Sequence, residues 1–181
     1  MQRPDACSCC LTCRSTRTSR LQGFAHAAGR RLACFVRRRK SCHHMSSVMP
    51  RTATCACGQA SITVDALPTM HGICHCKNCR RRTGSAFGIS AYFDRATVVS
   101  RTGETSVYAF HHAPQNHDQE RHFCPKCGTT LFWYVSALPE SIGIAGGCFA
   151  DDNLPDPTYS VTDKKREAWL TLPSNWKVYP D

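Results

Sequence analysis

Seven cysteines in three closely spaced groups constrain this chain more than any other feature. They form a first pair, a central triad and a last pair: Cys55 and Cys57; Cys74, Cys76 and Cys79; Cys124 and Cys127. Cysteines separated by one or two residues have the usual spacing of zinc ligands. A structural zinc ion takes four such ligands, whereas a catalytic zinc ion keeps one position open. We therefore expect a closed site from the two outer pairs and a three-sulfur site from the triad.

Each outer pair is followed by a glycine, Gly58 or Gly128. A chain that wraps its backbone N–H groups around a metal-bound sulfur turns tightly, and glycine accepts the positive φ that such a turn needs. One ion joining Cys57 to Cys124 would close a long loop, a constraint of about 4 kcal/mol in the chain-entropy treatment of cross-links. The alternatives are separate sites for the two pairs, or redox disulfides. We expect one structural zinc.

The triad Cys74, Cys76 and Cys79 leaves its fourth ligand open. A protein ligand would make it a second structural site; the candidates are His71, His75, His111, His112, His117 and Cys148. Without one, three thiolates on Zn²⁺ leave a charge of −1, which makes the metal a weak Lewis acid for water. A substrate thiol suits such a metal better, because zinc lowers the pKa of a bound thiol. An open triad therefore favours thiol transfer over hydrolysis.

Three arginines, Arg80, Arg81 and Arg82, follow the triad directly. Guanidinium groups bind carboxylates with two parallel hydrogen bonds, so these side chains are candidates for holding an anionic thiol such as a small peptide. The alternative is a solvated basic turn. His75 and His71 are the candidates for proton transfer near the triad.

The charge of the chain is concentrated in its first 50 residues. The whole chain carries a formal charge of +10. Residues 1–50 hold ten Lys or Arg against one acid, a net charge of +9, and residues 51–181 hold thirteen against twelve, a net charge of +1. We therefore predict two parts, a basic unfolded leader (1–50) and a nearly neutral zinc-binding domain (51–181). The basic pI alone gives no reason to call the domain nucleic-acid binding.

Three interpretations of residues 1–50 compete. The leader is an organelle-targeting segment, a basic arm for nucleic acid, or a segment absent from the mature protein because translation starts at Met45 or Met49. We favour the last. A cluster of thiols at Cys7, Cys9, Cys10 and Cys13 is expected to be disordered rather than metal-bound. No run of about 18 apolar residues predicts a membrane span, and the cysteine pattern favours a reducing, cytoplasmic location.

Beyond Cys55 the sequence is typical of a small, mainly β domain. Apolar residues alternate with polar or small ones at positions 87–93, the pattern of a strand with one buried face. Further strands are expected at 62–64, 97–100, 105–110, 129–135, 142–144 and 159–162. Residues 111–119, with a proline and three histidines, are expected to form a loop, and the one helical signal is a turn near 80–83.

The cysteines and their neighbours form three motifs. They are C-x-C-G at residues 55–58, C-H-C-x-x-C-R-R-x-T-G-S-A-F at 74–87 and F-C-x-x-C-G-T-x-L-F-W at 123–133. Together they resemble the glutathione-dependent formaldehyde-activating enzyme family, which also contains centromere protein V. The resemblance extends over about residues 52–172.

The resemblance implies a β-tent fold of short stacked sheets that holds two zinc ions. It assigns the structural ion to Cys55, Cys57, Cys124 and Cys127, and the catalytic ion to Cys74, Cys76 and Cys79. The implied activity joins glutathione and formaldehyde to S-(hydroxymethyl)glutathione, a carbon–sulfur lyase reaction. For this chain we expect glutathione or an analogue as the thiol, and formaldehyde or another small aldehyde as its partner. The alternative is a non-enzymatic zinc module similar to centromere protein V, with the basic leader as a nucleic-acid arm.

Overall fold

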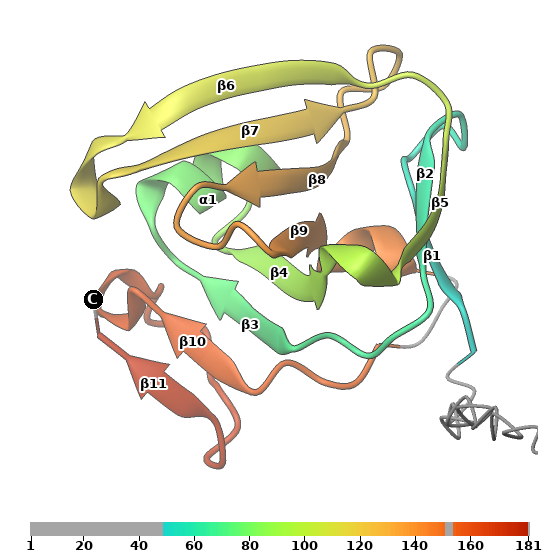
Figure 1. Cartoon of the computed structure of the whole chain (residues 1–181). Coiled ribbons are helices and arrows are strands. Elements are labelled where there is room, and N and C mark those ends of the chain that lie inside the picture. The colour runs from blue at the N-terminus through green and yellow to red at the C-terminus, as the bar shows by residue number, and fades with distance from the viewer. Residues whose placement is uncertain (1–48, 151–153, 181) are drawn as a thin grey trace, which may run out of the picture. The chain divides into compact units, whose positions relative to one another are not determined.

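A computed structural model describes residues 49–150 and 154–180 of the chain (Figure 1). The predicted leader, apart from its last two residues, lies outside the described residues, as do the thiols near its start. The division at residue 50 and the three interpretations of the leader therefore stay predictions.

Strands make up most of the regular structure in the described residues, which confirms the mainly β prediction. The elements in chain order are β1 (Arg51–Thr54), β2 (Ser61–Val64), β3 (Met70–Cys74), α1 (Lys77–Thr83), β4 (Gly88–Asp94), β5 (Val98–Thr102), β6 (Ser106–His112), β7 (His117–Phe123), β8 (Thr130–Val135), β9 (Ser141–Ala145), β10 (Tyr159–Val161) and β11 (Lys177–Tyr179). Short 3₁₀ turns join some of them: Arg95–Thr97, Ala113–Gln115, Gly146–Phe149 and Asp163–Lys165.

The strands form two sheets (Figure 1). The small sheet has the order β1-β2-β5, and the large sheet has the order β11-β10-β3-β4-β9-β8-β7-β6. Neighbouring strands run antiparallel except at one edge, where β10 is parallel to both β3 and β11. The antiparallel order allows short connections between β6, β7, β8 and β9, which are consecutive in the chain.

The hydrophobic core lies between the two sheets. Fully buried side chains from the small sheet pack with fully buried side chains from the large one in a single cluster. The largest members are Ile62, Val64, Phe93, Leu131, Ile142 and Ile144. Burying one such side chain stabilises the fold by about 1.5–3 kcal/mol. The alternation predicted at 87–93 is confirmed in its second half, since Ala91 and Phe93 face this core, whereas Ile89 is only half-buried and Phe87 precedes β4.

The prediction of a loop over residues 111–119 was wrong. His111 and His112 end β6, His117 starts β7, and only the turn between them lacks strand pairing, with Asn116 at a positive φ of 48°. The two strands pair along their whole length, His112 opposite His117. Apolar alternation is missing from β7 because its two buried residues, Gln119 and Arg121, are polar and line a cavity rather than the core.

Candidate metal centres and the adjoining cavity

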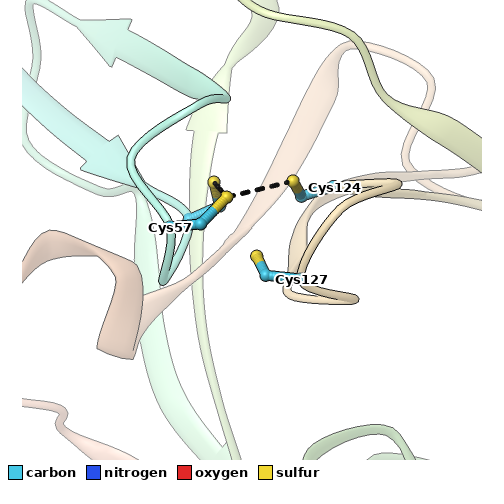
Figure 2. A group of neighbouring side chains, drawn as sticks. Cys57, Cys124 and Cys127 are labelled. Carbon is cyan, nitrogen blue, oxygen red and sulfur yellow. Dashed lines mark hydrogen bonds between the residues drawn. The ribbon is translucent and has the colours of Figure 1, made fainter.

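The four outer cysteines converge from two loops, and Figure 2 labels three of them, Cys57, Cys124 and Cys127. Cys55 and Cys57 follow β1, and Cys124 and Cys127 lie between β7 and β8. All four sulfurs lie within 4.8 Å of one another, with 3.6 Å between Cys55 and Cys57 and between Cys57 and Cys124. Four sulfurs on a tetrahedral zinc ion, each about 2.3 Å from the metal, would stand roughly 3.8 Å apart. This donor set therefore fits one closed zinc site.

Both loops make the tight turn expected after their cysteines. The N–H of Gly58 donates to the carbonyl of Cys55, and the N–H of Gly128 donates to the carbonyl of Cys124, each over 2.9 Å. The two glycines have φ values of +75° and +73°, a region that other residues enter only with strain. The positive φ predicted for the two glycines is confirmed.

Hydrogen bonds around Cys55 and Cys127 favour thiolates, the form that binds metal, whereas the neighbouring thiols raise the pKa of Cys57 to about 11. The N–H of Ala60 donates to the Cys55 sulfur over 3.2 Å. Hydrogen bonds from the hydroxyl and the backbone N–H of Thr129 lower the pKa of Cys127 to about 5. Cys55 and Cys124 are buried, whereas Cys57 and Cys127 are exposed.

The triad is built where β3 ends and α1 begins. Cys74 is the last residue of β3, Cys76 caps the N-terminus of α1, and Cys79 lies in its first turn. The three sulfurs lie within 4.8 Å of one another. The Cys76 sulfur accepts the N–H of Cys79 over 3.3 Å, and hydrogen bonds from the thiols of Cys74 and Cys79 lower the pKa of Cys76 to about 2. A sulfur so surrounded is a ready metal ligand.

Within residues 49–150 and 154–180, no further Cys, His, Asp or Glu joins the triad. The two histidines nearest to the triad in sequence form hydrogen bonds with backbone carbonyls. His71 Nδ1 lies 2.8 Å from Pro155 O, and His75 Nδ1 lies 3.3 Å from Ala86 O. His111 pairs with Asp118. Neither His71 nor His75 lines the cavity beside the triad, so its geometry does not support them as proton-transfer groups.

Cys148, another candidate for the fourth ligand, lies apart from the triad. Its thiol is 3.9 Å from the carbonyl of Thr130 and borders a separate hollow, which Cys127 also lines. Burial raises the pKa of Cys148 to about 11, so this sulfur stays protonated at neutral pH. Among the described residues, no fourth protein donor therefore joins the three sulfurs of the triad.

A cavity of about 580 Å³ opens beside the triad. All three cysteines line it, and so does the face of the large sheet that is turned away from the core. Its lining includes the side chains of Tyr92, Gln119, Arg121 and Trp133. Its volume is in the range of small-molecule sites.

Four neighbouring strands place one row of residues along this cavity. Tyr92 on β4, Gly143 on β9, Trp133 on β8 and Arg121 on β7 are directly paired across the sheet. A Cβ atom at Gly143 would lie 2.2 Å from Trp133 Nε1, so the missing side chain leaves the space that the indole occupies. The indole N–H reaches over Gly143 and donates to the Tyr92 hydroxyl.

The structure separates the three arginines that follow the triad. Arg82 lines the cavity, with its guanidinium 4.6 Å from the centre of the Trp133 ring and a buried Nη2 that has no hydrogen-bond partner. Arg80 forms an ion pair with Glu167, and Arg81 is exposed. Of the three arginines in this run, only Arg82 borders the cavity.

Sequence reasoning missed Tyr92, Gln119, Arg121 and Trp133 as site residues. Gln119 and Arg121 alternate with Glu120 and His122 along β7, but all four are polar, so their alternation gave no buried face to recognise. Tyr92 and Trp133 were read as ordinary strand residues. The only signal was the position of Gln119 and Arg121 just before the last cysteine pair.

Two comparisons with known proteins name the same family. A family model described as glutathione-dependent formaldehyde-activating enzyme matches residues 50–165. A Halomonas elongata protein, provisionally named as a glutathione-dependent formaldehyde-activating enzyme, is 29% identical over 138 residues, which cover 71% of this chain and 87% of that protein. A Rhodobacter sphaeroides crystal structure matches with 26% identity and a TM-score of 0.44, over 56% of this chain and 90% of that one.

Neither named match supports the centromere-protein alternative. No helix in the described residues has the length and apolar character of a membrane span. The cytoplasmic location stays a prediction.

Proposed function

This chain belongs to the glutathione-dependent formaldehyde-activating enzyme family, and on that premise we propose that it joins a thiol to formaldehyde or another small aldehyde. The thiol in this proposal is glutathione or an analogue. The observation that carries the proposal is the contrast between the two clusters. The four sulfurs of the outer pairs form a complete donor set between two loops. The three sulfurs of the triad line a cavity and have no fourth protein donor among the described residues.

The reaction forms one carbon–sulfur bond. The thiolate sulfur attacks the carbonyl carbon, the π electrons of the C=O bond move to oxygen, and that oxygen takes up one proton. With glutathione and formaldehyde the product is S-(hydroxymethyl)glutathione. The reverse reaction breaks the same bond, which is the basis of a carbon–sulfur lyase assignment. No oxidant or reductant is needed.

The two metal sites have different roles in this proposal. Cys55, Cys57, Cys124 and Cys127 would hold a structural zinc that joins the loop after β1 to the loop before β8. Cys74, Cys76 and Cys79 would hold a second zinc, which lowers the pKa of a bound thiol and so supplies a thiolate at neutral pH. The hydrogen bond from the Cys79 N–H holds the Cys76 sulfur in the orientation in which it would bind this second zinc.

Tyr92 is placed to donate a proton to the aldehyde oxygen. The indole of Trp133 donates to the Tyr92 oxygen, so the Tyr92 O–H remains available to an acceptor in the cavity. Burial raises the pKa of Tyr92 above its ordinary value of 10, which keeps its proton in place at neutral pH. A donor aimed at an oxygen that gains negative charge stabilises the transition state.

Arg82 is the member of the arginine run that can meet a substrate in this cavity. Its unpartnered Nη2 offers a hydrogen bond to a carboxylate or to an amide oxygen of the thiol. Arg80 and Arg81 lie outside the cavity lining, and their contribution to substrate binding would be limited to long-range attraction of an anion.

The test is a rate measurement on the zinc-loaded full chain. Glutathione and formaldehyde also combine without a catalyst, so the uncatalysed rate must be measured as the reference. Exchange NMR of the equilibrium mixture gives the rate of adduct formation with and without protein. We expect acceleration by the wild type and by Cys148→Ser, and none by Cys76→Ser with its fold retained. An uncatalysed rate with the zinc-loaded wild type would refute the proposal.

A further inference from the structure

Arg121 is a buried cation without an acidic partner. Only 8% of its surface is exposed, and its side chain lines the cavity beside the triad. Its Nη2 donates to Gln119 Oε1 over 3.2 Å, while its Nε is buried with no hydrogen-bond partner. None of the ion pairs in the described part of the chain includes it. Buried charged groups are normally paired, so we expect the Arg121 guanidinium to bind an anionic group of a ligand.

The surroundings of Arg121 hold the guanidinium in one place. Its central carbon lies 4.7 Å from the centre of the Phe110 ring, on the neighbouring strand β6. Gln119 lies two residues away on the same face of β7. A guanidinium fixed by a ring and an amide loses little freedom when it binds, which strengthens recognition of a planar anion.

The charge of the cavity points to the same kind of partner. No Asp or Glu lines it, whereas Arg82 and Arg121 both do. Burial lowers the pKa of Arg121, and the charge of Arg82 lowers it further. A divalent metal on three thiolates would carry −1 against +2 from the two arginines, so the cavity would hold an unbalanced positive charge. A substrate with a negative group besides its sulfur would balance it.

We propose that Arg121, held by Gln119 and Phe110, is a specificity-determining residue that binds a carboxylate of the thiol substrate. The inference rests on the proposed thiol–aldehyde activity and narrows its substrates to thiols that carry a carboxylate. The unpartnered Nε–H and the remaining N–H groups of the guanidinium form the hydrogen bonds, while the sulfur lies at the triad. Thiols without a carboxylate react poorly, because they leave the buried charge unpaired.

The test compares two thiols that differ only in the carboxylate, N-acetylcysteine and N-acetylcysteinamide. Rates of adduct formation with formaldehyde, above the uncatalysed rate, should be measured for the zinc-loaded wild type and for Arg121→Gln. We expect kcat/KM for N-acetylcysteine to fall about 10- to 100-fold in the variant, the loss typical of a charge-assisted hydrogen bond. The value for N-acetylcysteinamide should change by less than about twofold.

Arg101→Gln is the matched control. Arg101 also lies over an aromatic ring, with its central carbon 5.2 Å from the centre of Phe132, but it does not line the cavity. Its removal should leave the kcat/KM of both thiols unchanged. A fall of equal size for both thiols in Arg121→Gln would overturn the proposal, because it would mean that the arginine does not recognise the carboxylate.

Binding separates this inference from the proposed function. Calorimetric titration of the wild type should give a lower Kd for N-acetylcysteine than for N-acetylcysteinamide, with or without turnover. Equal Kd values would overturn the role of Arg121, even if both thiols react. Preferential binding without any acceleration would refute the proposed activity and leave the carboxylate site standing. The wild-type comparison also holds if Arg121→Gln fails to fold.

Discussion

The indole N–H of Trp133 donates a hydrogen bond of 3.2 Å to the hydroxyl oxygen of Tyr92, across the strand that separates the two residues. That strand, β9, carries Gly143 between them. The bond fixes the Tyr92 hydroxyl at the wall of the cavity beside the triad. It also occupies an acceptor site of that hydroxyl, which leaves its proton for a ligand.

Replacement of Tyr92 by Phe should therefore lower kcat about 100-fold, the usual effect of removing one donor to a developing oxyanion. The KM for the thiol should change little, because the sulfur and the carboxylate bind elsewhere. Tyr134→Phe is the control: Tyr134 is next to Trp133 on β8 but contacts Arg95 outside the cavity. An unchanged kcat in Tyr92→Phe would exclude the donor role.

Gly143→Ala should displace the Trp133 indole, because the new Cβ would lie 2.2 Å from Nε1. Overpacking of this kind costs about 1–3 kcal/mol of stability. Gly147→Ala should be nearly neutral, since no heavy atom lies within 4 Å of the Cβ position at Gly147. Urea unfolding curves of the two variants measure the difference, and equal midpoints would contradict the packing described for Trp133.

The two cysteine clusters should respond differently to single substitutions. Cys124→Ser should unfold or aggregate the chain, because a structural zinc contributes on the order of 10 kcal/mol, as much as the whole stability of many domains. Cys76→Ser should keep the fold and lose the thiol chemistry. Circular dichroism and zinc content per chain provide the measurement. Equal unfolding of both variants would rule out separate structural and catalytic roles.

His71 should make stability depend on pH. Burial lowers its pKa below the ordinary value of 6.5, so the unfolded chain takes up a proton on this ring more readily than the folded chain does. The stabilising contribution is complete above about pH 6.5 and is lost as the pH falls through the lower folded value, by at most about 1.4 kcal/mol per pH unit.

His71→Gln keeps a donor for the carbonyl of Pro155 but cannot ionise, so its stability should fall less steeply in that pH range than the stability of the wild type. Chemical unfolding at each pH, with zinc content measured in parallel, separates this effect from metal loss. Identical slopes for the wild type and the variant would show that His71 does not contribute.

The metal clusters were predictable because their spacing is local. Cys74, Cys76 and Cys79 lie within six residues, and the glycine after each outer pair already indicates a tight turn. The turn expected near 80–83 is the C-terminal part of α1. This helix buries none of its residues, so it has no apolar stripe that would have predicted its length.

The cavity was not predictable, because it depends on the pairing of distant strands. The sequence alone does not tell that Arg121 lies opposite Trp133, or that one side of β7 lines a cavity. The same holds for the fourth ligand of the triad. Six residues had a suitable donor, and in the fold none of them joins the three sulfurs.

Half of the four-sulfur cluster faces the solvent, since Cys57 and Cys127 are exposed while Cys55 and Cys124 are buried. Peroxide or a competing chelator can therefore attack it without any opening of the fold. The loops on either side belong to different sheets, so the first oxidation event would loosen the junction between them. We expect oxidation of Cys57 and Cys127 to limit how long the purified protein stays folded in storage. A mild reductant and a small excess of zinc should lengthen that time.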